Sequence, residues 1–324
     1  MRFRSGEAVV HAADDVSFDL QQGETLAIVG ESGSGKSATA MSLLRLVEPS
    51  GGVVEFDGKD ILRSSLTQVR KIRGRRIAMI FQDPSASLNP YMTIGAQMAE
   101  MTRMHLGHSR TEARDHAIRM LETVGIPDAA VRVDAHPHEF SGGMRQRAVI
   151  AMALSCDPEI LIADEPTTAL DVTVQAQILE LIKELKERTG MSVILITHDL
   201  GVVAGMADRV VVMYAGRVFE EASTEEIFSR SANPYTIGLL KCTPDPSKEN
   251  GGKLYQIPGS PPDLSNLPPG CPFAERCERA EAVCRAEFPP FVEVAPSHRS
   301  LCHFAHDVYE RFGCEYPPAS LPTV

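Results

Sequence analysis

GESGSGKS, which spans Gly30–Ser37, is the stretch of sequence that decides the fold. It fits the pattern G-x-x-x-x-G-K-[ST], follows the apolar run ETLAIVG (Glu24–Gly30) and precedes KSATAMSLLRLV, whose apolar residues recur at helical spacing. A strand, a glycine-rich loop and a helix in this order bind phosphate, because the glycines turn backbone N–H groups inward and the helix N-terminus adds positive charge. We therefore predict a nucleotide site here, and not a turn that carries a surface lysine.

Two side chains of this loop have specific predicted roles with ATP. Lys36 is expected to reach the β- and γ-phosphates, and the Ser37 hydroxyl is expected to ligate Mg²⁺. The backbone of the loop is expected to surround the α- and β-phosphates. The predicted nucleotide-binding residues of the loop are Gly30, Glu31, Ser32, Gly33, Ser34, Gly35, Lys36 and Ser37.

A pair of acids follows a second apolar run, EILIAD. Asp164 ends this predicted strand, where a carboxylate is expected if it holds the Mg²⁺ shell. Glu165 comes next and is predicted to be the general base, or the group that orients the attacking water. An acid pair at a strand end is often only a helix cap, but the phosphate loop upstream favours the catalytic interpretation.

Three further motifs narrow the class of ATPase. Gln82 follows RIAMIF, within expected reach of the Mg²⁺ ion and the attacking water, and His198 follows SVILIT, within expected reach of a γ-phosphate. The segment FSGGMRQR places Ser141, Gly142 and Gly143 at the start of a predicted helix. The chain therefore carries a second helix N-terminus suited to an anion, but only one complete nucleotide site.

Length and composition are those of an ordinary globular protein. The 324 residues suffice for one large domain and a smaller one, and strands that alternate with helices predict an α/β fold with a mainly parallel sheet. The formal net charge of −11 argues against a broad nucleic-acid-binding face. The sequence shows no secretory signal and no apolar run long enough to cross a bilayer, so we expect a cytosolic protein.

The motifs together resemble the nucleotide-binding subunit of an ABC transporter. The phosphate loop, Gln82, SGGM, ADEP, TALD (Thr168–Asp171) and His198 occur in the order and spacing of that family over nearly the whole chain. The resemblance implies a P-loop ATPase cassette with a mixed sheet core and a helical subdomain. It also implies a head-to-tail dimer, in which SGG of one subunit caps the γ-phosphate bound by the other and the Asp171 loop crosses the interface.

Several segments resemble the oligopeptide/dipeptide importer branch of this family. They are MIFQDPSASLNP, NPYTIGLL and the tail that begins at IPGSPPDLSNLPPGCPFAERC. The sequence around Gln82 resembles that of the D-type subunit. The resemblance implies that the chain powers peptide import from the cytoplasmic face of the inner membrane. Its implied partners are an F-type ATPase, two membrane permeases and an external solute-binding protein, with no nucleic acid.

Three other functions stay open at this point. The same machinery also carries nickel or another small solute in this branch. A non-transport ABC ATPase of DNA repair or translation is disfavoured by the single cassette, the acidic balance and the importer-type tail. A sensor that binds ATP without hydrolysing it is disfavoured by the intact Glu165 and His198.

Two positions depart from the family pattern. Met144 stands where the signature usually has glutamine, and we expect little loss because Ser141 and the Gly143 backbone make the phosphate contacts. The family stacks adenine on an aromatic residue near the N-terminus, and Phe3 is the residue that the resemblance implies. The chain starts two residues before Phe3, so we expect most of that first strand to be missing.

The resemblance also implies how the chain is divided. Residues 1–240 are the expected nucleotide-binding domain, and residues 84–155 within it are the helical subdomain that docks the permeases. Residues 241–324 are the expected importer-type C-terminal region, in which the proline-rich segment IPGSPPDLSNLPPG forms no regular element.

Four of the seven cysteines gather in that C-terminal region. Cys271, Cys277, Cys284 and Cys302 are spaced C-x5-C-x6-C-x17-C, and FAERCERAEAVCRAE predicts a helix with two of the thiols on one face. Clustered cysteines in a cytosolic chain indicate metal or redox chemistry, although the short knuckles of structural zinc sites are absent. The resemblance implies a [4Fe–4S] cluster, and zinc or four reduced thiols are the alternatives. Cys156, Cys242 and Cys314 are expected to be ordinary thiols.

Overall fold

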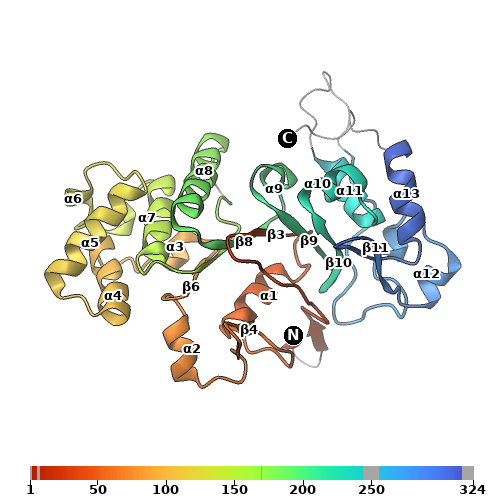
Figure 1. Cartoon of the computed structure of the whole chain (residues 1–324), viewed down its shortest axis with the longest axis horizontal. Helices are drawn as coiled ribbons and strands as arrows, with labels where there is room; N and C mark the ends of the chain where they lie inside the picture. The colour runs from red at the N-terminus through yellow and green to blue at the C-terminus, as the bar shows by residue number, and fades with distance from the viewer. Residues whose placement is uncertain (1, 6–7, 169, 244–254, 316–324) are drawn as a thin grey trace. The chain divides into compact units, whose positions relative to one another are not determined.

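The computed structural model describes residues 2–5, 8–168, 170–243 and 255–315 of the chain (Figure 1). The chain divides into two compact units. Unit 1 comprises Met1–Leu20, Thr25–Gly52 and Thr197–Val324, and unit 2 comprises Gln21–Glu24 and Val53–Ile196. The division between the units does not fall at residue 240. The predicted domain boundary at that residue and the predicted helical subdomain 84–155 therefore stay predictions.

Unit 1 is built on a mixed sheet whose strands lie in the order β3-β9-β10-β12-β11. β3 pairs with β9 in parallel, and the remaining neighbours pair antiparallel. Runs such as RVVVMY form strands because β-branched side chains pack well on a sheet that is covered on both faces. The strands are β3 (Thr25–Val29), β9 (Arg209–Tyr214), β10 (Arg217–Ser223), β11 (Phe291–Ala295) and β12 (His298–Leu301).

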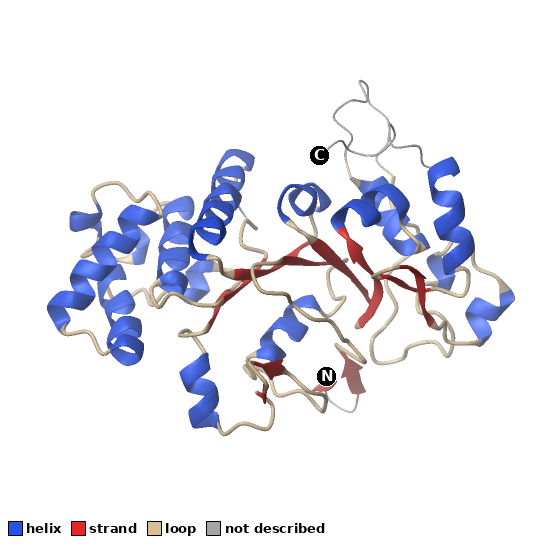
Figure 2. Cartoon of the chain, in the orientation of Figure 1, coloured by secondary structure: helices blue, strands red, loops and turns tan. Residues whose placement is uncertain are grey.

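Helices surround this sheet, and a short antiparallel hairpin of β1 (Arg2–Ser5) and β2 (Ala8–His11) completes the unit. Figures 1 and 2 show α10, α11 and α13 gathered beside β10 and β11, where α10 and α11 pack against β10 and α13 against α10 and β11. The helices of unit 1 are α1 (Lys36–Leu43), α9 (Leu200–Met206), α10 (Thr224–Arg230), α11 (Pro234–Cys242), α12 (Ala282–Ala286) and α13 (Ala305–Glu315).

The core of unit 1 contains a cluster of aromatic rings. Tyr214, Phe219, Tyr235 and Phe273 are all buried, and their ring centroids lie between 4.5 and 5.9 Å apart in mostly edge-to-face geometry. Phe273 belongs to the C-terminal region, whereas Tyr214 and Phe219 lie in β9 and β10. The C-terminal region therefore shares one hydrophobic core with the nucleotide-binding part of the unit.

Unit 2 contains three parallel strands in the order β8-β7-β6, namely β6 (Ile77–Ile80), β7 (Ile160–Asp164) and β8 (Ser192–Thr197). The long helix between β7 and β8 is α8 (Val172–Thr189), which ends at Gly190 in the left-handed conformation, as the sequence predicts. Parallel pairing in both units, together with the antiparallel strands of unit 1, confirms the predicted α/β fold with a mixed sheet.

The rest of unit 2 is mainly helical, and α4, α5 and α7 pack on one another. Ser109 begins α5 with a capping box, because its hydroxyl accepts from the Glu112 N–H while the Glu112 carboxylate accepts from the Ser109 N–H. The helices are α2 (Leu66–Ile72), α3 (Pro84–Ser87), α4 (Ile94–Leu106), α5 (Arg110–Thr123), α6 (Ala129–Arg132) and α7 (Gly142–Leu154), and the hairpin strands are β4 (Glu55–Phe56) and β5 (Lys59–Asp60). In the part of the chain described, no helix is both long and apolar enough to span a membrane.

Candidate functional site

The phosphate loop joins β3 to α1 within unit 1, and its shape requires glycine. Gly30, Gly33 and Gly35 have φ angles of 149°, 80° and 98°, which L side chains rarely adopt. A Cβ atom at Gly30 would lie 2.1 Å from the Met213 carbonyl oxygen, and one at Gly35 would lie 2.0 Å from that of Ala12. Only glycine therefore lets the loop pack this closely on the backbone of its neighbours.

The polar groups of the loop are arranged around its own backbone. Lys36 is buried, and its Nζ donates to the carbonyl oxygens of Gly30 at 2.7 Å and Glu31 at 3.0 Å. Ser34 Oγ is also buried, and the described residues offer it no hydrogen-bond partner. An unsatisfied buried hydroxyl beside a buried ammonium fits a loop that receives an anionic ligand, since phosphate oxygens accept from both groups.

The acid pair lies at the end of β7 in unit 2. Asp164 is its last residue and is buried, and Glu165 follows with a φ angle of 46°. The Glu165 N–H donates to the Ile196 carbonyl oxygen of β8. Its Oε2 accepts from Gln82 Nε2 at 2.9 Å and from Thr168 Oγ1 at 2.8 Å. The structure thus brings the predicted base and the predicted Gln82 into direct contact.

The second predicted anion site also lies in unit 2. Ser141 is the N-cap of the 13-residue helix α7, and its hydroxyl accepts from the Met144 N–H at 3.3 Å. Gly143 is held close to α8, where an added Cβ atom would lie 2.9 Å from Val174 Cγ1. Asp171 caps α8 through a 3.0 Å hydrogen bond from the Val174 N–H. Both Ser141 and Gly142 are exposed.

The two remaining residues of the predicted site lie in unit 1. His198 is exposed between β8 and α9, directly before Asp199, whose carboxylate caps α9. Phe3 lies in β1, where it pairs with Val10 of β2. The structure describes the backbone of Phe3 alone, so its proposed contact with adenine stays a prediction.

The chain matches two known family models. The model of the family described as ABC transporter matches residues 13–168, and the model described as oligopeptide/dipeptide transporter, C-terminal region, matches residues 219–284. The oligopeptide transport ATP-binding protein OppD of Salmonella typhimurium is 49% identical over 303 residues, which cover 93% of this chain and 90% of that protein. The chain belongs to the ABC transporter family. Its catalytic activity is therefore that of an ABC ATPase.

Further relatives and solved structures extend this likeness. The dipeptide transport ATP-binding protein DppD of Bacillus subtilis is 52% identical over 93% of this chain and 91% of its own length. A dimeric ATP-binding cassette solved in a post-hydrolysis state with ADP and Pi is 30% identical, with a TM-score of 0.63 over 69% of this chain and 95% of that one. These matches confirm the predicted cassette and its D-type relatives. They also agree with ATP and Mg²⁺ as the general cofactors of the family.

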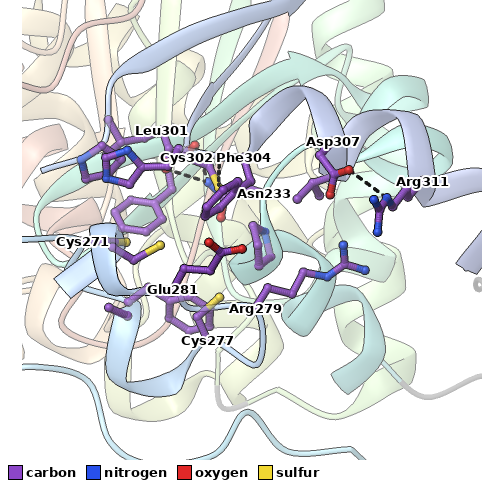
Figure 3. Close-up of a pocket in the computed structure, with 18 residues that line it drawn as sticks. Asn233, Cys271, Cys277, Arg279, Glu281, Leu301, Cys302, Phe304, Asp307 and Arg311 are labelled. Atoms are coloured by element: carbon purple, nitrogen blue, oxygen red, sulfur yellow. Dashed lines mark hydrogen bonds and ion pairs between the residues drawn. The ribbon is translucent and has the colours of Figure 1, made fainter. Parts of the chain in front are cut away.

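The four clustered cysteines of this ABC ATPase converge on one cavity in unit 1. The cavity measures about 310 Å³, and Cys271, Cys277, Cys284 and Cys302 all line it. Figure 3 shows the sulfur atoms of Cys271 and Cys277 at this cavity, with Cys302 across from them. All four cysteines are free of disulfides. The four cysteines thus share one cavity of unit 1.

The helix that was expected to present two of these thiols does not form. Ala274–Arg276 is a single 3-10 turn, Cys277 leaves it in an extended conformation, and α12 begins only at Ala282. The prediction of one helix across this segment is therefore wrong. Helix propensity loses to packing here, because the Cys271 N–H donates to the Cys284 carbonyl oxygen at 2.7 Å and folds the segment back on itself.

Burial shifts the pKa values of three of the clustered thiols. Burial raises the pKa of Cys271 to about 11 and that of Cys302 to about 12, and the neighbouring cysteines add to both shifts. Burial also raises the pKa of Cys277. Among the described residues, no group of three or more His, Cys, Asp or Glu side chains is arranged to hold a metal ion. The described structure therefore does not support a preformed metal centre at these cysteines, whether of zinc or of iron.

Sequence reasoning missed two residues that contact the phosphate loop. Tyr235 accepts a 2.9 Å hydrogen bond at its hydroxyl from the Glu31 N–H, and Arg276 forms an ion pair with the Glu31 carboxylate. The two partners of the ion pair are separated by 245 positions in the chain. No local pattern in the sequence predicts such a pair, because no sequence motif includes both residues.

Proposed function

We propose that this chain is the ATP-hydrolysing subunit that powers import of dipeptides or oligopeptides across the cytoplasmic membrane. The observation that carries the proposal is the C-terminal region, whose match at residues 219–284 is to the oligopeptide/dipeptide branch. The relatives named as oligopeptide and dipeptide transport proteins extend over 93% of this chain and so include that region. Nickel or another small solute is the alternative cargo of the same machinery.

The proposed nucleotide site uses the residues that the motifs select. Lys36 and the backbone of the phosphate loop bind the phosphates, and Ser37, Asp164 and Gln82 hold the Mg²⁺ shell. Glu165 accepts a proton from the attacking water, and His198 contacts the γ-phosphate. The buried ammonium of Lys36 and the contact of Gln82 with Glu165 support these roles.

The proposed assembly contains a second ATPase subunit. The exposed N-terminus of α7, with Ser141, Gly142 and Gly143, caps the γ-phosphate bound by that subunit, and Asp171 lies at the same interface. The partner is an F-type ATPase, and two permeases and an external solute-binding protein complete the importer. The chain is then peripheral, on the cytoplasmic face of the inner membrane.

Reconstitution of the complex in proteoliposomes tests this function. We expect ATP hydrolysis to rise when an oligopeptide-loaded binding protein is added outside, and labelled peptide to accumulate inside. Binding protein loaded with Ni²⁺ serves as the matched comparison. Stimulation of ATP hydrolysis by Ni²⁺ and not by peptide would assign the alternative cargo. A rate of ATP hydrolysis that changes with neither ligand and with neither permease would contradict a role in transport.

We also propose that the four cysteines hold a [4Fe–4S] cluster. What supports the proposal is that all four cysteines line one cavity, and four cysteine thiolates are the usual ligands of such a cluster. When bound, the cluster supplies a covalent cross-link among four positions of the C-terminal region. The chain's own part would be to lose the thiol protons, and the raised pKa values of Cys271 and Cys302 make that loss dependent on pH.

Anaerobic purification tests the cluster. We expect a brown protein with about four irons per chain, and we expect Cys277→Ser to lose both colour and iron. Cys242→Ser is the control, because Cys242 lies in α11 and does not line the cavity. Colourless protein with neither iron nor zinc by elemental analysis would leave four reduced thiols as the answer.

A further inference from the structure

Arg276 connects the C-terminal region to the phosphate loop. It lies between two of the clustered cysteines, directly before Cys277. Its guanidinium makes a bidentate pair with the Glu31 carboxylate, with Nη1 to Oε2 at 2.6 Å and Nη2 to Oε1 at 2.9 Å. The Arg276 side chain is only 5% exposed and that of Glu31 is 25% exposed. Paired charge-assisted hydrogen bonds of this kind are among the stronger contacts in proteins.

The guanidinium is fixed from other sides as well. Nε donates to the Pro258 carbonyl oxygen at 2.9 Å, and Nη1 also donates to the Tyr214 hydroxyl at 3.1 Å. The group lies over the rings of Tyr214 and Phe273 at 5.7 and 5.8 Å from their centroids. The Arg276 side chain is therefore fixed by contacts with the core and with the C-terminal region. Through the ion pair it also fixes the position of the Glu31 carboxylate.

Glu31 is in turn bonded through every polar group it has. Its N–H donates to Tyr235, its carboxylate binds Arg276, and its carbonyl oxygen accepts from Lys36 Nζ at 3.0 Å and from the Ser34 N–H at 3.1 Å. The orientation of Glu31 thus decides where the loop presents its lysine and its serine.

The charge of Glu31 makes the arginine more important. A carboxylate at the second position of a phosphate loop repels the phosphates, unless a cation neutralises it. In the structure that cation is Arg276, at hydrogen-bonding distance. Loss of Arg276 would therefore both loosen the loop and leave a partly buried negative charge beside an anion site.

We propose that Arg276 is a positioning residue for nucleotide binding, which fixes and neutralises Glu31 so that the phosphate loop is ready for ATP. The C-terminal region then sets the ATP affinity of its own chain. This inference rests on the proposed role of the loop in binding ATP. It assigns a function to a residue that lies 245 positions away from its partner in the loop.

Equilibrium binding of MgATP to the full chain tests the proposal, in a Glu165→Gln background that prevents hydrolysis during the measurement. We expect Arg276→Gln to weaken ATP binding on the order of tenfold, a size common for coupling between sites. We expect Arg276→Lys to weaken ATP binding less. Lysine keeps the positive charge but replaces the planar guanidinium, which pairs through two nitrogens, with a single ammonium group.

The double variant separates positioning and neutralisation from a general loss of stability. Glu31→Gln combined with Arg276→Gln removes the uncompensated charge, so it should bind ATP more tightly than Arg276→Gln alone. Arg285→Gln is the matched control, because its exposed side chain pairs only at the surface, with Glu275 at 3.1 Å. We expect that control to bind ATP as the parent chain does.

Several results would overturn the inference. They are unchanged ATP affinity in folded Arg276→Gln, an equal loss in Arg285→Gln, or a double variant no better than the single one. The unfolding midpoint without nucleotide shows whether Arg276→Gln folds. If it does not fold, the ATP affinity of Arg276→Lys tests the proposal instead, and parental affinity in that variant contradicts it. A parent chain that binds no ATP would instead contradict the proposed function.

Discussion

Glu165 illustrates at the residue scale how the site of unit 2 is held. Its φ angle of 46° is unusual for a residue with a side chain and costs roughly 1 kcal/mol or more. The strain is maintained by the hydrogen bond from its N–H to Ile196, and it directs the carboxylate to Gln82 and Thr168. Backbone strain of this kind gathers at functional sites, which agrees with the role of general base.

Glu165→Gln should separate hydrolysis from binding. The amide keeps the shape of the side chain but cannot accept a proton from water, so we expect ATP hydrolysis to fall on the order of 10²–10⁴-fold while ATP binding is retained. Steady-state hydrolysis by the complex and equilibrium binding by the chain measure the two effects. Glu180→Gln, an exposed carboxylate on α8, is the control and should change neither. Near-parental hydrolysis in Glu165→Gln would refute the assignment.

At the scale of elements, a buried histidine joins β12 to β10 and α10. His298 is fully buried, with Nε2 2.8 Å from Glu220 Oε1 and Nδ1 3.0 Å from Glu226 Oε2. Burial by itself lowers the pKa of His298, but the hydrogen bonds and charges of the two carboxylates outweigh burial and raise it. Tyr309 of α13 closes the cluster, with its hydroxyl on Glu226. The His298 imidazole therefore ties the C-terminal strands and helix to the sheet.

This cluster predicts a dependence of stability on pH. Because the pKa of His298 is higher in the folded chain than the unfolded value of about 6.5, its contribution is complete below that value and is lost as pH rises through the folded pKa. We expect His298→Gln to lower the free energy of unfolding by roughly 3 kcal/mol at pH 6, and by less at pH 9.

Thermal or denaturant unfolding at both pH values measures the difference. His306→Gln is the control, since that histidine is exposed on α13 and should have little effect at either pH. A loss for His298→Gln that stays the same from pH 6 to pH 9 would show that the neutral form holds the cluster equally well.

At the scale of the whole molecule, residues far apart in the chain complete unit 1. The aromatic core of unit 1 takes residues from β9, β10, α11 and the C-terminal region. The mixed sheet likewise ends in β12 and β11. In the sequence these two strands are separated from β10 by α10, α11 and α12. The importer-type C-terminal region is consequently part of the body that carries the phosphate loop, and a change in it has a physical route to nucleotide binding.

The sequence by itself determined the local structures of this protein: the phosphate loop, the acids at the end of β7, the N-terminus of α7 and the helix α8. Each is specified within a few residues, by glycines with positive φ, by a capping side chain or by hydrophobic period, so no distant contact is needed. The same local reasoning was wrong about the helix around Cys277, where a backbone hydrogen bond between two cysteines overrides propensity.

Only the tertiary structure decided which distant side chains meet. The pair of Arg276 with Glu31, the burial of His298 between two glutamates and the convergence of four cysteines on one cavity all join segments that lie apart in the sequence. Such contacts follow from strand register and core packing, which set the distance between particular atoms. A sequence pattern carries no record of that distance, because it depends on the summed packing of the chain between the two partners.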